Sequence, residues 1–208
     1  MKYGLIGSLI PVLLDKPVYK YTGNAIPELD MKEFRKAHKK QYKEMVLRTS
    51  GVGSLKDNMF AIVMYLACYG FSYYKTDPEH ISLDIFDGMI DAICKSEIMK
   101  KMYKNKNCFD PKEIDKYVKG SIRSKKKKYP MDWVFDFSYD LSVPEYFVTH
   151  RECGICKIGK QESLEFLVPH MCVMDYPTIE YKGGKLLRSK TLGNGDDCCD
   201  FHVVKKEA

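Results

Sequence analysis

The sequence lacks the short motifs that mark several large enzyme classes. It has no phosphate-binding P-loop, no GxGxxG dinucleotide fingerprint, no HExxH zinc-protease motif and no GxSxG nucleophile elbow. It has no internal repeat, and its one low-complexity stretch is the run Lys125 to Lys128. The enzyme classes that those motifs define are therefore excluded, and any catalytic chemistry has to come from other residues.

The sequence also offers little that would suit a membrane. The apolar run at residues 1–14 is too short to span a bilayer. It resembles a signal peptide, but Asp15 and Lys16 follow it directly and no small-x-small cleavage site appears. We therefore expect a packed N-terminal segment in a cytoplasmic protein that has no membrane partner. A reducing compartment would keep its cysteines as free thiols.

The composition is that of a globular chain with an uneven charge. Hydrophobic residues make up 45% of the 208, enough for one domain with a real core. Residues 1–130 hold 25 Lys and Arg against 15 Asp and Glu, whereas residues 131–208 hold 9 against 13. The basic half could suggest nucleic acid, but Lys125 to Lys128 suit a solvated helix C-terminus and no arginine–aromatic interleaving accompanies them. We expect no nucleic-acid partner.

Helical periodicity and helix-start signals fill the first two thirds of the chain. The run at residues 59–74 is apolar nearly all round, which predicts a central, buried helix. The start signals are Asp30 with Glu33, Ser54 with Asp57, Ser82, and Asp110-Pro111 with Glu113.

The hydrophobic period changes to two after residue 130. Residues 132–139 alternate with an aromatic face, residues 145–153 indicate a second strand, and a helix is expected from about Gln161 to Met174. Residues 185–204 indicate a hairpin closed by a glycine turn. The pattern predicts an α+β fold in a single domain, 1–208. N-terminal helices (1–130) would pack on a C-terminal four-stranded antiparallel sheet with one inserted helix (131–208).

Eight cysteines raise the question of a metal site. Cys153-x-x-Cys156 has the spacing of a zinc knuckle, with His170 and Cys172 downstream. A second knuckle is missing, because Cys198 and Cys199 are adjacent and neighbouring strand residues point to opposite faces. We therefore expect free thiols and no stoichiometric zinc.

A thiol nucleophile is the other interpretation of these cysteines. Cys153 ends a strand that carries His150 and Arg151, and Cys172 lies three residues before Asp175. Alternation puts Cys199 on the inner face of the last strand. Thiol, imidazole and carboxylate could thus meet, as nucleophilic catalysis requires. Each cysteine also has a simpler interpretation as a small buried residue.

The C-terminal residues are more specific as a set than any one of them alone. They are Cys153 at a strand end, Cys172-Val173-Met174-Asp175, and Arg188-Ser189-Lys190-Thr191-Leu192-Gly193-Asn194-Gly195-Asp196-Asp197-Cys198-Cys199-Asp200-Phe201. This pattern, over residues 131–204, resembles the L-2-amino-thiazoline-4-carboxylic acid hydrolase family. Ser189 stands where the family has Thr, and Cys156 and Cys198 are additional.

The resemblance implies hydrolysis of a small cyclic amidine-thioether to an N-carbamoyl cysteine, without an organic cofactor. The candidate catalytic residues are Cys153, Cys172, Asp175, Cys199, Asp200 and His150. The candidate residues for binding the substrate are Arg151, Arg188 and Thr191. Attack by Cys199 or Cys153, or by a water activated by Asp175 or His150, stays open at this point. A homo-oligomer also stays open.

The helices-then-sheet order also resembles small-molecule-binding domains of the vinyl-reductase type. A non-catalytic binding or sensory domain is therefore the alternative function. A pocket that gathers thiol, imidazole and carboxylate favours the hydrolase. An apolar pocket with the cysteines buried apart favours the binding domain.

Overall fold

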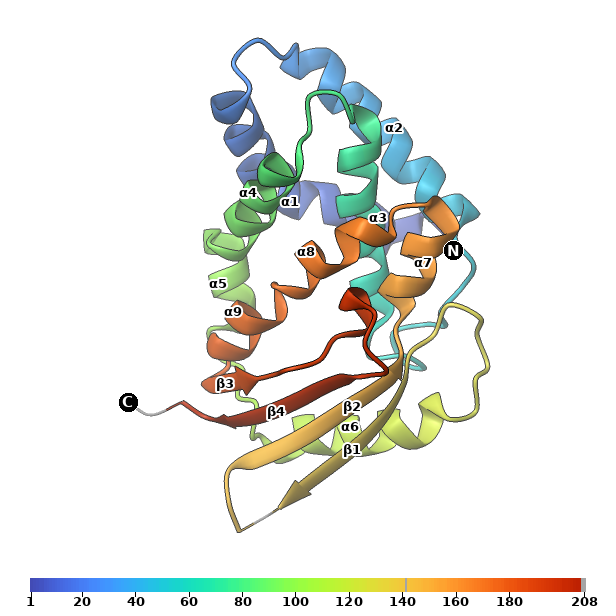
Figure 1. Cartoon of the computed structure of the whole chain (residues 1–208), viewed down its shortest axis with the longest axis vertical. Coiled ribbons are helices and arrows are strands. Elements are labelled where there is room, and N and C mark those ends of the chain that lie inside the picture. The colour runs from blue at the N-terminus through green and yellow to red at the C-terminus, as the bar shows by residue number, and fades with distance from the viewer. Residues whose placement is uncertain (141, 207–208) are drawn as a thin grey trace.

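The computed structural model describes residues 1–140 and 142–206, and in it a group of helices precedes an antiparallel sheet (Figure 1). The first helices are α1 (Gly4–Ala25), α2 (Met31–Arg48), α3 (Ala61–Thr76), α4 (Leu83–Cys94), α5 (Glu97–Tyr103) and α6 (Pro111–Ser124). The strands are β1 (Val134–Asp140), β2 (Glu145–Glu152), β3 (Gly184–Leu187) and β4 (Cys199–Lys205). Between β2 and β3 lie α7 (Gly154–Glu162), the 3-10 turn η1 (Glu165–Leu167), α8 (Val168–Cys172) and α9 (Asp175–Glu180), and the 3-10 turn η2 (Leu192–Asn194) precedes β4.

Three of the four predicted helix starts are confirmed by capping hydrogen bonds. Asp30 accepts from the backbone N–H groups at the start of α2, Ser82 does so for α4, and Asp110 for α6. The signal at Ser54 is wrong. Ser54 and Asp57 bond to each other, but α3 begins only at Ala61, after a further turn. A capping pair thus stabilises a turn as readily as a helix start.

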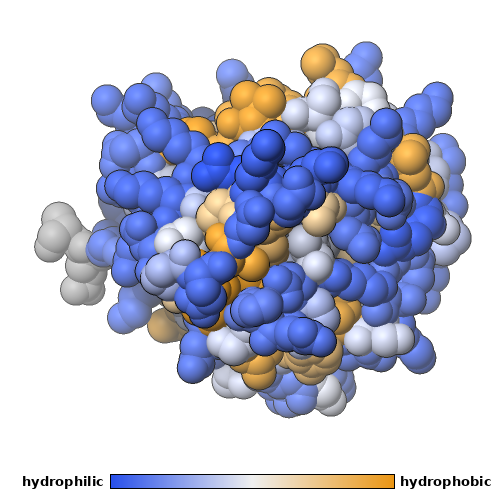
Figure 2. All heavy atoms as spheres, turned by 90° about the horizontal axis from the view of Figure 1, so that it is seen from above, coloured by the Kyte–Doolittle hydropathy of each residue, from blue (hydrophilic) through white to orange (hydrophobic). Residues whose placement is uncertain are grey.

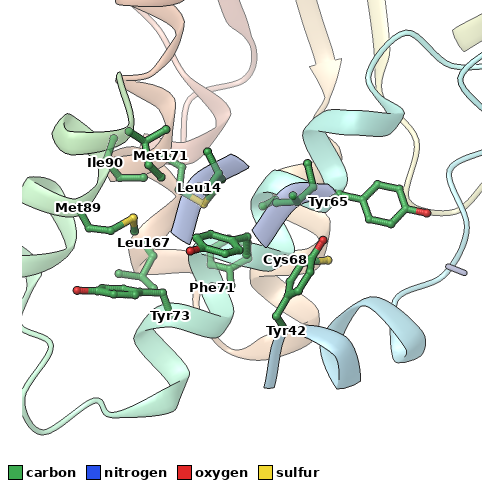
Figure 3. Close-up of a cluster of buried hydrophobic side chains, with 14 of the residues drawn as sticks. Leu14, Tyr42, Tyr65, Cys68, Phe71, Tyr73, Met89, Ile90, Leu167 and Met171 are labelled. Carbon is green, nitrogen blue, oxygen red and sulfur yellow. The ribbon is translucent and has the colours of Figure 1, made fainter. Parts of the chain in front are cut away.

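The helices share one core that extends into the C-terminal segment. Leu14 of α1, Tyr42 of α2, Phe71 of α3 and Met89 of α4 are buried together with Met171 of α8 (Figure 3). The central position expected for the apolar helix is confirmed, because most of α3 is buried. The helical part therefore packs on the residues that follow β2 as well as on itself.

The sheet has the order β1-β2-β4-β3, with antiparallel pairing throughout. The predicted α+β fold with N-terminal helices and a C-terminal sheet is confirmed. Tyr146, Val148 and His150 of β2 are buried on the inner face, and Cys199 of β4 pairs with His150. The end of the sheet where β2 stops and β4 starts thus faces the helices.

The segment between β2 and β3 differs from the expected helix at residues 161–174. α7 begins almost directly after β2 and ends at Glu162, because the next residue, Ser163, has a left-handed φ of 57°. Pro169 then falls in the first turn of α8, where a missing N–H costs nothing. A series of short helices, coloured orange in Figure 1, therefore joins the helical part to the sheet.

Among the described helices, none combines the length and the hydrophobicity that crossing a membrane requires. Seen from above, the surface is mostly hydrophilic, with separate hydrophobic areas (Figure 2).

Candidate functional site

A small cavity lies between the inner face of the sheet and the helices. Its volume is about 140 Å³. Phe60, Tyr117, Trp133 and Tyr146 give it aromatic walls. The remaining polar groups on its lining are His150, Cys153, Cys172, Asp175, Thr178, Lys182, Arg188 and Cys199. Apolar walls with a few converging polar groups are typical of a small-molecule site.

Cys153 reaches this cavity because β2 ends and α7 begins at that point. It is the N-cap residue of α7, with extended backbone angles, and it is half-buried. The neighbouring Cys156 thiol, followed by the backbone N–H groups of Cys156 and Ile155, holds the pKa of Cys153 below the ordinary thiol value despite burial. Gly154 fixes the position, since a Cβ there would lie 2.6 Å from the Met131 carbonyl oxygen.

The other two thiols of the cavity, Cys172 and Cys199, have raised pKa values. Burial, followed by the nearby Asp175 carboxylate, raises the pKa of Cys172 to about 12. Burial raises the pKa of Cys199 to about 11, although the Leu192 N–H donates to its sulfur at 3.2 Å. At neutral pH both are therefore thiols, and Cys153 is the thiol of the three that ionises most readily.

Asp175 and Arg188 form the charged pair of the site. Arg188 donates to the Asp175 carboxylate at 2.7 Å and to the Cys172 carbonyl oxygen at 3.1 Å. Its guanidinium also lies against the rings of Tyr176 and Phe201. The Arg188 side chain is 4% exposed, whereas that of Asp175 keeps 41% of its surface and lines the cavity. The surrounding protein raises the pKa of the Asp175 carboxyl, and Arg188 opposes that rise.

His150 brings an unused polar atom to the cavity. It is 8% exposed and packs against the rings of Phe60, Phe135 and Phe201. Burial, with the positive charge of Arg188, lowers the pKa of His150 to about 4, so the imidazole is neutral. Its Nδ1 is buried without a hydrogen-bond partner among the described residues. Such an atom is unusual in a folded protein and indicates a place for a ligand or water.

Three residues singled out in the sequence lie elsewhere. Asp200 is on the outer face of β4, where it accepts from Ser189 and from the Lys190 N–H. Arg151 is also on the outer face of the sheet and pairs with Asp136 at 3.5 Å. The Thr191 hydroxyl accepts from the Asn194 N–H and so caps η2. Strand alternation explains the first two positions, because each is next to a residue that points inward.

Lys182 lines the cavity but was not singled out in the sequence. It lies in the turn between α9 and β3, and it makes no ion pair with any described residue. Its Nζ is 5.8 Å from the centre of the Tyr103 ring. A lone lysine in a turn carries no sequence signal, so only the fold could bring it to attention.

Within residues 1–140 and 142–206, no group of three or more His, Cys, Asp and Glu side chains is placed to hold a metal ion. Cys153, Cys156, Cys172 and Cys199 therefore do not form a zinc knuckle in the described structure.

The fold and the cavity together define a class: an α+β protein with a thiol-lined site between the sheet and the helices. The chain belongs to the L-2-amino-thiazoline-4-carboxylic acid hydrolase family, whose model matches residues 57–203, well over half of its length. The match extends upstream of the C-terminal motifs and includes α3 to α6. No curated protein and no solved structure matches the chain.

Proposed function

We propose that the protein is a hydrolase that opens a small cyclic amidine of the thiazoline type by cleaving its C–S bond. The observation that carries the proposal is the meeting of Cys153, Asp175 and His150 on one cavity, within the segment that matches the family. A thiol of lowered pKa, a carboxyl of raised pKa and a neutral imidazole are suited to attack and to proton transfer at neutral pH.

Cys153 is the proposed nucleophile. Its thiolate attacks the amidine carbon of the ring, and the ring C–S bond breaks to leave a covalent isothiourea on Cys153. Water then adds to the same carbon, and the bond to the Cys153 sulfur breaks. The product carries a carbamoyl group and a free thiol, and the enzyme recovers its thiol.

Asp175 and His150 are the proposed proton carriers. A carboxyl of raised pKa retains a proton more readily than one with an ordinary pKa, so Asp175 can give that proton to the departing ring sulfur. The unpartnered Nδ1 of neutral His150 can bond the water of the second step. Arg188 donates a hydrogen bond to Asp175 and so holds the Asp175 carboxyl group on the wall of the cavity.

Lys182 is the proposed partner of the substrate carboxylate. Arg188 already shares its donors between Asp175 and Cys172, whereas Lys182 has no carboxylate partner within the described chain. A cation without an ion-pair partner on the lining of a small cavity favours a small anionic ligand.

The test offers 2-amino-thiazoline-4-carboxylate and related cyclic amidines to the wild type, Cys153→Ser, Asp175→Asn and Cys198→Ser. Chromatography of the carbamoyl product measures turnover. Cys198 is buried but does not line the cavity, so Cys198→Ser is the matched control.

We expect Cys153→Ser to lose at least about a hundredfold in kcat and Asp175→Asn about tenfold or more, with the control unchanged. A folded wild type that turns over none of these compounds but binds them would support the non-catalytic binding domain instead. Turnover that survives in Cys153→Ser would move the nucleophile to water or to another thiol.

A further inference from the structure

The feature that the proposed reaction does not use is the second thiol of the Cys153-x-x-Cys156 pair. Cys156 lies on α7, half-buried, and is not part of the cavity lining, whereas Cys153 is. The two cysteines are three residues apart across the start of α7, and each side chain is the largest influence on the pKa of the other. Towards Cys172 and Cys199, Cys153 acts only through its charge.

The backbone at this point leaves Cys153 free of the helical spacing that would keep the two thiols apart. Residues three apart on a helix are neighbours, with Cβ atoms about 5–6 Å apart, and a disulfide needs about 3.5–4.5 Å. Cys153 is the cap residue and not part of the helix, with φ −122° and ψ 126°, so its Cβ is not fixed at the helical spacing. Gly154 packs against Met131 and Trp133 and anchors this end of α7.

Of the two thiols, only Cys153 can be reached from the cavity. Cys153 is open to a cavity that holds the unpartnered Nδ1 of His150, a group that itself indicates a ligand. Cys156 is three residues further along the chain, within α7, and is not on the cavity lining. An attacking thiol on a cavity with a second thiol close by is an arrangement suited to thiol–disulfide exchange.

We propose that Cys153 and Cys156 are a redox-active dithiol, which low-molecular-weight disulfides oxidise to an intramolecular disulfide that removes the cavity thiol from use. The formation of the disulfide rests on the position of Cys153, which caps α7 three residues before Cys156 and lines the cavity. Its effect on turnover rests on the proposed function.

The exchange takes place in two steps. The Cys153 thiolate attacks one sulfur of the small disulfide, whose S–S bond breaks, and one small thiol leaves. Cys156 then loses its proton to the second departing thiolate, and its sulfur attacks the Cys153 sulfur. The two cysteines are oxidised by two electrons, and the small disulfide is reduced to two thiols.

The negative charge of the Cys153 thiolate explains why Cys156 reacts only in the second step. Contact with Cys153 raises the pKa of Cys156, followed by burial, so Cys156 stays protonated while Cys153 is a thiolate. Once Cys153 is bound in a mixed disulfide that charge is gone, and Cys156 ionises more easily. The order of the two steps follows from the pair itself.

The sequence makes the pair unusually easy to observe. Trypsin cuts after Arg151 and after Lys157, so Cys153 and Cys156 fall on the peptide 152–157 without any other cysteine. The protein is equilibrated with oxidised and reduced glutathione at a series of ratios, its free thiols are blocked with N-ethylmaleimide after unfolding, and the peptides are weighed.

We expect the wild-type peptide to lose both labels together and to become lighter by two hydrogens. Cys156→Ser should stop at a glutathione adduct on Cys153, and Cys198→Ser should behave as the wild type. A peptide that stays fully labelled at oxidising ratios, or Cys153 found linked to the peptide of Cys172 or Cys199, would overturn the proposal. The wild-type result requires no variant to fold.

Turnover of the thiazoline is measured on the same samples. It should fall in proportion to the oxidised peptide and return with dithiothreitol. Undiminished turnover by fully oxidised protein would overturn the inhibitory effect. If reduced protein shows no turnover, the proposed function fails, and the peptide masses still decide whether the dithiol exists.

Discussion

The helical part and the sheet side of the cavity each bury a histidine, and the two differ in their hydrogen bonding. Burial lowers the pKa of both to about 4. His38 of α2, 0% exposed, uses both ring nitrogens, with Tyr19 at 2.9 Å and with Ser72 and the Tyr69 carbonyl on the other side. His150 leaves Nδ1 without a partner. The same electrostatic shift thus accompanies a structural group in one place and an available one in the other.

Two carboxylates repeat the contrast. Glu162, at the end of α7, is 3% exposed and is bonded by Arg48 of α2 at 2.6 Å and by Lys75 of α3 at 2.6 Å. These partners, Arg48 first, hold its pKa at about 2. Asp175 has Arg188 alone, and its pKa is raised. Two cationic partners fix the charge of Glu162, whereas at Asp175 the effect of the surrounding protein outweighs the single partner Arg188 and raises the pKa.

The comparison teaches that burial alone does not identify the site. Cys68 of α3 is also deeply buried, and burial raises its pKa to about 12 while it contacts Thr49. What distinguishes the cavity is that its unpartnered atom, Nδ1 of His150, lies among other polar groups on a cavity wall, whereas the Tyr42 hydroxyl, which is also buried without a described partner, lies in the helical core. Protein interiors satisfy nearly all polar groups, so an unpartnered polar atom on a cavity wall has a functional explanation more often than a structural one.

The largest expected effects come from exchanging each histidine for leucine. His38→Leu should lower the free energy of unfolding by about 3 kcal/mol, because the Tyr19 hydroxyl loses its partner in the core. His150→Leu should leave stability unchanged or raise it slightly, since it removes a polar atom that had no partner. Urea denaturation measures both.

Turnover should respond in the opposite order. His150→Leu should lose at least about a hundredfold in kcat, whereas the folded fraction of His38→Leu should retain full activity. If His150→Leu destabilises the protein as much as His38→Leu does, the contrast is wrong, because Nδ1 of His150 would then have a structural hydrogen-bond partner.

A smaller effect, with a distinct pH dependence, is expected for Glu162→Gln. The folded pKa of about 2 is below the unfolded value of 4.5, so this carboxylate stabilises the fold above pH 4.5 and loses that effect as pH falls towards 2. The variant should be less stable by about 2 kcal/mol at pH 7, a figure reduced because Arg48 and Lys75 are each more than a third exposed.

The check is thermal unfolding of both proteins between pH 2 and pH 7. The difference in stability should shrink on acidification. A difference that stays constant over that range would mean that Glu162 acts by packing and not by charge.

The fold and part of the candidate site could be predicted from the sequence, but the contrast between the two histidines could not. Strand alternation predicted that Cys199 faces inward, and capping residues predicted the starts of α2, α4 and α6, because both signals are local. Asp200 and Arg151 were wrongly grouped with the cavity residues. They lie within or beside the family motif, but strand alternation puts them on the outer face of the sheet. The ionisation of Cys153 depends on where α7 begins, and the helix predicted at residues 161–174 was displaced by the left-handed Ser163.

The smallest expected effect compares two cations on opposite faces of the sheet. Lys182→Met should raise KM for the thiazoline carboxylate about tenfold and change kcat little, because the cation is proposed to bind ground state and transition state alike. Arg151→Met removes the same charge from the outer face, where its partner Asp136 is exposed, and should change neither constant. A substrate amide in place of the carboxylate should abolish the difference between wild type and Lys182→Met. If both variants raise KM equally, the effect is the long-range field of the protein, which added salt would remove. If neither does, Arg188 binds the carboxylate, and its bond to Asp175 must open when the substrate enters.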